Sequence, residues 1–212
     1  MDTQKSLLQK HLKDGIARAK KIIENTKDLK LHVGCGTVYK DGWINIDNNS
    51  DNNIEKLNLI WDVTFPLPFS TNSVSFLYNE HLLEHLEVKN AQRVLKDFLR
   101  VLKPGGVMRI AMPDLNSCVN TYNNKDYLKN SQESLMRNGL GHVKTNAELL
   151  NINMRYWGHQ WLYDWEELER RLRDAGCEQI VQCSFGESEH VELVNIESRS
   201  ESILIAEVTK NM

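Results

Sequence analysis

The chain has 212 residues, which is enough for one domain with a substantial hydrophobic core. Its net charge of -3 argues against a nucleic-acid-binding surface, because such surfaces usually make a domain basic. No apolar run is long enough to cross a membrane, and the polar N-terminus leads into no signal core. The four cysteines are scattered without a C-x-x-C pair, which favours reduced thiols and a cytoplasmic location.

Residues 1–29 carry an apolar stripe that predicts an N-terminal amphipathic helix. The stripe residues lie three and four positions apart: Leu8, Leu12, Ile16, Ala19 and Ile23. We expect this helix to pack beside a sheet, and a lid over a ligand site is the alternative.

The stretch from Leu31 to Gly36 is a short apolar run that ends at two glycines, Gly34 and Gly36. A second apolar run, residues 43–46, ends at Asp47. Glycine allows the backbone to approach a ligand closely, and an acid at the end of the next strand can accept both hydroxyls of a ribose. The pattern therefore predicts the opening of a nucleoside-binding α/β domain.

Strands and a helical segment alternate over the next part of the chain. We expect strands over 57–63, 74–78 and 107–112, and a helix from His81 to Leu102 that is ended by Pro104 and the glycines after it. Such alternation implies a parallel sheet with right-handed crossovers.

The C-terminal part has a different pattern. Asp164 and Glu167 predict a capping box, and Gly176 is placed to end the helix that follows. The strand-like runs 180–185 and 202–208 are joined by a polar connection without helical periodicity, so we expect them to pair antiparallel.

Between these parts lies an insertion, residues 115–163. A connection of this length is usually a lid or a substrate-binding element with helices of its own. Its aromatic side chains could serve that purpose or form a small separate core: Tyr122, Tyr127, Tyr156, Trp157, Trp161 and Tyr163.

The order of these motifs resembles that of the class I S-adenosylmethionine-dependent methyltransferases. The sequence around the motifs is similar to a group of small bacterial methyltransferases. The resemblance is carried by residues 31–36, Asp47, Asp62-Val63, residues 80–86, 102–106, 112–115 and 157–163, and the tail from Glu201 to Lys210. It implies a Rossmann-like, doubly wound α/β fold with a mostly parallel seven-stranded sheet and an antiparallel C-terminal hairpin strand. Residues 30–212 would form the single methyltransferase domain.

The resemblance also implies which residues bind S-adenosylmethionine. Gly34 and Gly36 would lie under its methionine part and Asp47 would bind its ribose hydroxyls. Asp62 would face the adenine amino group, the Val63 amide would face a ring nitrogen, and Asn79 would lie near the sulfonium. The sequence departs from the family where Val38 replaces a frequent third glycine and where the usual first helix has no room before Trp43. The missing helix also disfavours NAD, whose pyrophosphate needs a helix N-terminus.

The methyl acceptor is expected to be a small molecule or a sugar-type compound, methylated on oxygen, with neither a nucleic acid nor a membrane as partner. Candidates for a general base are His81, Asp114 and His159, with His142 as a further histidine of the insertion. One alternative function is a catalytically inactive S-adenosylmethionine-binding module that serves a partner.

A third alternative is a zinc metallopeptidase, because residues 81–85 match H-x-x-E-H. On a helix, His81 and His85 would share a face and could bind zinc, with Glu84 as the base. No separate third ligand is evident, and we expect no metal.

Overall fold

A computed structural model describes residues 2–48, 56–137 and 139–212. Its centre is one seven-stranded sheet of order β3-β2-β1-β4-β5-β7-β6, in which β1 to β5 run parallel and β7 is antiparallel to both its neighbours. The strands are β1 (Leu29–Val33), β2 (Ile44–Asp47), β3 (Leu59–Ile60), β4 (Val74–Glu80), β5 (Leu102–Met112), β6 (Gln179–Gln182) and β7 (Leu204–Thr209). This arrangement confirms the Rossmann-like fold and the antiparallel C-terminal hairpin, although β3 is much shorter than the run 57–63.

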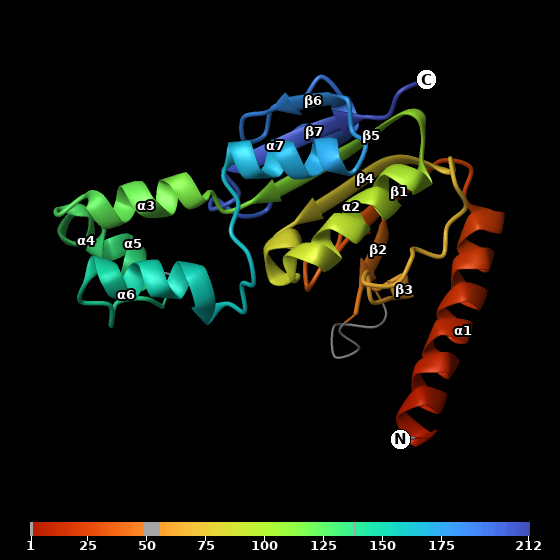
Figure 1. Ribbon diagram of the computed structural model, residues 1–212, viewed down its shortest axis with the longest axis horizontal. Helices are drawn as coiled ribbons and strands as arrows, with labels where there is room; N and C mark the ends of the chain where they lie inside the picture. The colour runs from red at the N-terminus through yellow and green to blue at the C-terminus, as the bar shows by residue number, and fades with distance from the viewer. Residues whose placement is uncertain (1, 49–55, 138) are drawn as a thin grey trace.

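Helices surround the sheet in three groups (Figure 1). α2 and α7 lie on one face, α3 to α6 form a lobe beyond one end of the strands, and α1 stands beside the β3 edge. The α-helices are α1 (Asp2–Asn25), α2 (Val88–Val101), α3 (Leu115–Asn123), α4 (Tyr127–Asn130), α5 (Gln132–Arg137), α6 (Asn146–Asn151) and α7 (Trp165–Asp174). Shorter turns are the 3₁₀ segments Leu83–His85 and Val191–Leu193 and the π-helical turn Ile152–Tyr156.

The main core lies between the sheet and the α2–α7 layer, where α2 buries Ala91, Val94, Leu95 and Phe98. A smaller core covers the other face and includes Trp43, Tyr78 and Leu193. Because successive residues of a strand point to opposite faces, Leu77 and Tyr78 of β4 serve the two cores in turn.

α1 packs against the main core through Leu12, Ile22 and Ile23. Ala19 is buried, and a Cβ at Gly15 would lie only 2.8 Å from the ring of Trp61. Ile16, in contrast, is 53% exposed, so this one residue of the predicted stripe lies off the buried face that Leu12, Ala19 and Ile23 share. Leu8 lies outside the described side chains.

The predicted helix from His81 to Leu102 was wrong at its start. His81 has a positive φ of 53°, the 3₁₀ turn Leu83–His85 follows, and α2 begins only at Val88. A left-handed residue cannot begin a right-handed helix. His81 and His85 therefore do not share a helical face, and the geometry assumed for an H-x-x-E-H zinc peptidase is absent. After α2, β5 pairs with β4 at Leu102 and again from Val107.

The insertion begins and ends at adjacent points, where Asp114 and Tyr163 form a parallel bridge. Its own small core consists of Leu135, Val143 and Leu149 with partly buried neighbours. Of its aromatic residues, Tyr127 packs on this core, Tyr163 belongs to the main core, and the others are exposed: Tyr122, Tyr156, Trp157 and Trp161.

The C-terminal predictions are confirmed in most details. Asp164 caps α7 by accepting a hydrogen bond from the Glu167 amide at 2.9 Å, and Gly176 follows the helix with a φ of 99°. The predicted capping box is only half formed, because the carboxylate of Glu167 pairs with Arg170 and Arg171 instead of returning to the backbone of Asp164. No helix among the described residues combines the length and the apolar character that crossing a bilayer would need.

Candidate active site

A cleft of about 1040 Å³ opens at the carboxyl ends of β1, β2, β4 and β5. Open parallel sheets bind ligands at this edge. One part of the cleft is lined by the strand ends and the other by the insertion and the segment 199–203. Lining residues of the first part include Gly34, Gly36, Asp47, Asp62, Val63 and Glu80.

The glycine turn after β1 is fastened to the end of β2. The amides of Gly34 and Cys35 both donate to the Ile46 carbonyl, at 2.8 and 3.1 Å, and the Gly36 amide donates to Asp47 Oδ2 at 2.8 Å. Gly34 and Gly36 have positive φ values of 71° and 52°. A Cβ at Gly34 would meet Leu82 at 2.8 Å, whereas no heavy atom in the described part of the chain lies within 4 Å of a Cβ at Gly36. Among the described residues, a side chain at Gly36 would therefore meet no neighbouring atom.

Asp62 and Val63 follow β3 and line the same part of the cleft. Asp62 is exposed, and its Oδ1 accepts hydrogen bonds from the Thr64 amide at 2.9 Å and the Thr64 hydroxyl at 2.8 Å. These two bonds fix the turn that presents the Val63 backbone.

The end of β4 differs from the sequence expectation. Asn79 is fully buried and is not among the residues that line the cleft. The next residue, Glu80, lines it instead and accepts hydrogen bonds from Ser198, Arg199 and Ser202. Sequence reasoning missed Glu80, although an acid at the end of a buried strand is a signal of the same kind as Asp47.

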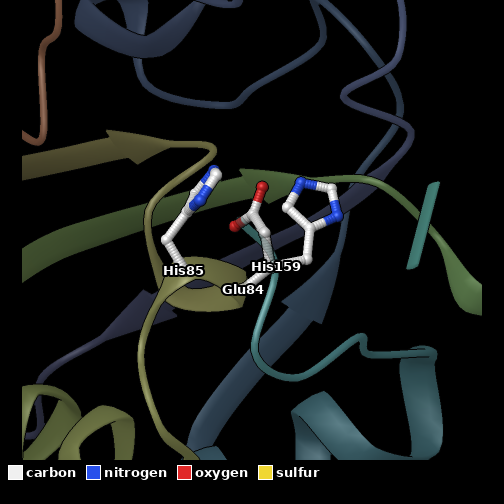
Figure 2. Close-up of side chains that lie close together, drawn as sticks. All are labelled: Glu84, His85 and His159. Atoms are coloured by element: carbon white, nitrogen blue, oxygen red, sulfur yellow. The ribbon is translucent and has the colours of Figure 1, made fainter. Parts of the chain in front are cut away.

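The histidines of the cleft gather around Glu84 (Figure 2). Glu84 is fully buried, and its carboxylate lies between the rings of His85 and His159. His81 Nδ1 is 3.1 Å from Glu84 Oε1, and the ring centroids of His85 and His159 are 4.9 Å apart. Burial lowers the pKa of His85, which favours a neutral ring.

Of the two remaining candidates for a general base, one lines the cleft and the other does not. Asp114 lines the cleft and also caps α3, since its Oδ1 accepts from the Asn116 amide at 2.9 Å. His142 is exposed and is not among the lining residues. The cleft thiol, Cys118, has a raised pKa because of burial, which disfavours a nucleophilic thiolate.

Comparison with known proteins gives one family match: residues 31–110 match the model of a family described as "Methyltransferase domain". The match runs from β1 into β5 and includes the glycine turn, Asp47, Asp62 and Glu80. No curated protein sequence matches the chain significantly.

Solved structures share the fold at low sequence identity. A SAM-dependent methyltransferase from Archaeoglobus fulgidus is 17% identical with a TM-score of 0.53, and the alignment covers 92% of each chain. A SAM-dependent methyltransferase from Thermotoga maritima is 17% identical with a TM-score of 0.51, covering 93% of this chain and 88% of that one. A Haemonchus contortus N-methyltransferase in complex with S-adenosylhomocysteine is 12% identical with a TM-score of 0.50, and the alignment covers 94% of this chain and 53% of that one.

The strand order, the glycine turn with its positive φ values and the acid at the end of β2 are compatible with a nucleoside cofactor. Residues 31–110 therefore match a methyltransferase domain, and the whole chain has the fold of S-adenosylmethionine-dependent methyltransferases, which supports an enzyme of this class with S-adenosylmethionine as cofactor.

Proposed function

We propose that this enzyme methylates an oxygen of a small polar acceptor, such as a saccharide, in the part of the cleft under the insertion. The observation that carries the proposal is the two-part cleft of about 1040 Å³. Sites for one small ligand usually measure roughly 300–1,000 Å³, so this cleft lies at the upper end of that range, which supports a cofactor site with space for a small acceptor beside it.

The strand ends would hold the cofactor. Asp47 would accept the ribose hydroxyls while its Oδ2 keeps the Gly36 amide in place, and the backbone of Gly34 and Gly36 would lie along the methionine part. Asp62 and the Val63 amide would contact the adenine. For Asn79, the place near the sulfonium stays a prediction, and the lining position of Glu80 makes it the alternative.

The insertion would hold the acceptor. Its cleft-facing residues combine hydroxyl, amide, carboxylate and aromatic groups: Asp114, Ser117, Thr121, Tyr127, Asn153 and Trp157. A few polar groups among apolar ones can orient a polyhydroxylated ligand. This supports residues 115–163 as a substrate-binding lid on a single domain spanning 30–212. The cytoplasmic location stays a prediction.

The bound cofactor supplies a methyl group on a sulfonium, which is already an activated leaving group. The protein must align the acceptor and accept its proton. His81 is the best-placed base, because it lines the cleft directly after β4 and its Nδ1 lies beside Glu84, with Nε2 free of protein hydrogen bonds among the described residues. Asp114 and His159 are the other candidates.

Calorimetric titration with S-adenosylmethionine tests the cofactor half. We expect Asp47→Ala to weaken binding at least tenfold, about 1.4 kcal/mol, and Asp47→Asn to have a smaller effect because it keeps an acceptor for the Gly36 amide. Asp41→Ala, at an exposed acid outside the cleft lining, should bind like the wild type. Unchanged affinity in Asp47→Ala would contradict the assigned site.

The acceptor half is tested by measuring S-adenosylhomocysteine release with a panel of saccharides and small alcohols, phenols and amines. Turnover with a hydroxylated compound would support the proposal. Turnover confined to amines, or cofactor binding without turnover on any acceptor, would favour N-methylation or an inactive binding module respectively.

A further inference from the structure

We propose that Glu84, His85 and His159 form a binding site for a divalent transition-metal ion, with Zn²⁺ as the ion that best suits its ligands. Methyl transfer from S-adenosylmethionine requires no metal. The H-x-x-E-H motif indicated a different set of metal ligands, which included His81. The site combines two residues of the turn after β4 with one residue of the insertion.

The geometry is that of a ligand set before the ion is bound. One potential ligand atom from each residue lies within 4.8 Å of the others, and Figure 2 shows the Glu84 carboxylate between the two imidazole rings. Metal–ligand bonds of about 2.0–2.2 Å in a tetrahedral site place ligand atoms roughly 3.4 Å apart. Small side-chain rotations would bring the three groups to that spacing.

The main chain explains why residues so far apart in sequence meet here. The amides of Gln160 and Trp161 both donate to the carbonyl of Glu84, at 2.6 and 3.2 Å. These two bonds hold the end of the insertion against the 3₁₀ turn. His159, the residue before Gln160, is thereby fixed beside Glu84, so the cluster rests on backbone contacts as well as on its own side chains.

The environment of Glu84 favours a bound cation. Its side chain is 1% exposed, and neither carboxylate oxygen has a hydrogen-bond partner among the described residues. His81 Nδ1 is near Oε1 at 3.1 Å, but outside hydrogen-bond geometry. Burying a carboxylate without such partners is unfavourable, and a metal ion would compensate it.

The hydrogen bond of His159 leaves one ring nitrogen available to a metal. His159 Nδ1 contacts the Asn153 carbonyl at 2.5 Å. A carbonyl only accepts, so Nδ1 carries the proton and Nε2 keeps its lone pair. Metal-binding histidines commonly make such a bond, which fixes the ring and its tautomer.

Two imidazoles and one carboxylate are a ligand set typical of catalytic zinc, which keeps a further position open. His85 and His159 both line the cleft, so the open position would face it. If the proposed function holds, the ion would bind the acceptor oxygen there and lower the pKa of its hydroxyl. His81 would then be free to receive the proton.

Zinc titration of the chelator-stripped, full-length protein tests the site, with a chromophoric chelator as competitor. We expect one tightly bound Zn²⁺ per chain, a higher melting temperature in its presence, and at least tenfold weaker binding in His85→Gln and in His159→Gln. His190→Gln, which removes a histidine that stacks on Phe76 away from the cluster, is the matched control and should bind like the wild type.

Circular dichroism and titration with S-adenosylmethionine would accompany each variant. Retained fold and cofactor binding together with lost zinc binding would support the site. Absence of stoichiometric zinc binding in the folded wild type, or equal affinity in wild type and both cluster variants, would overturn it. Because cofactor binding is measured separately, failure of the metal site leaves the methyltransferase assignment intact.

Discussion

Gly34 and Gly36 both need glycine, but for different reasons. At Gly34 a Cβ would collide with Leu82, so the requirement is internal packing. At Gly36 no described atom lies near a Cβ and the residue lines the cleft, so we expect the requirement to be the approach of a ligand. The sequence pattern indicates both glycines equally, and only the packing around them separates the two roles.

Gly36→Ala should therefore weaken cofactor binding by more than its effect on stability explains. An alanine at a φ of 52° is strained by about 1–2 kcal/mol, and its methyl group would occupy the cleft. Gly42→Ala is the matched control, because Gly42 has a φ of 77°, no described atom near its Cβ, and no place in the cleft lining.

We expect similar losses of stability in the two variants by chemical denaturation. Calorimetry should show weaker S-adenosylmethionine binding, at least tenfold, only in Gly36→Ala. Equal affinities in the two variants would mean that Gly36 serves the turn alone.

Among the elements, helix ends were predictable where a side chain marks them. Asp164 before α7 is such a mark, and the structure confirms it as the N-cap. Glu87 precedes α2 and makes no side-chain capping bond. The apolar periodicity therefore predicted that a helix is present but not the residue at which it begins. The Glu84–His159 contact was also hidden, because it depends on how the insertion folds back and on no local pattern.

Removing the cap of α7 should destabilise the protein without affecting the cleft. Asp164→Ala leaves the Glu167 amide without its acceptor, which typically costs about 1 kcal/mol. For a chain of this size that corresponds to a fall in melting temperature of roughly 2–4 °C.

Asp174→Ala at the other end of α7 is the control. It removes an exposed pair with Arg170 and an acid from the unfavourable end of the helix dipole, so its effect should stay within about 0.5 kcal/mol. A cap variant as stable as this control, in calorimetric melting curves, would show that the first turn of α7 is held by its packing alone.

For the whole molecule, alternating strands and helices were sufficient to predict the sheet, since connection rules leave few topologies. The cleft needed more. One wall, residues 199–203, is held by Glu80 at the end of β4, more than a hundred positions earlier. Nearby, buried Arg109 of β5 pairs with Glu197 and with Glu207 of β7. Such contacts join segments that are far apart in the sequence through single charged residues. The hydrophobic periodicity of the sequence therefore cannot predict them.

Glu80 should make the stability of the molecule sensitive to acid. Burial raises the pKa of its carboxyl, but the hydrogen bonds from Ser198, Ser202 and the Arg199 amide outweigh that effect, and the pKa falls below the ordinary value of 4.5. A lowered native pKa means that this contribution is complete above the unfolded pKa and is lost as the pH falls through the native one.

Glu80→Gln should lower the free energy of unfolding at neutral pH by about 1.5–3 kcal/mol, the range for hydrogen bonds to a charged group. Urea unfolding of wild type and variant at successive pH values measures the difference. It should be constant at neutral pH and shrink as the pH drops below 4.5, where the carboxyl of the unfolded chain binds its proton first, until the native carboxyl is protonated as well. Glu189→Gln, at an exposed position, should follow the wild-type curve. If the difference in unfolding free energy between wild type and Glu80→Gln stayed the same in acid, the effect of Glu80 would come from its packing. The wall of the cleft would then not depend on the charge of Glu80.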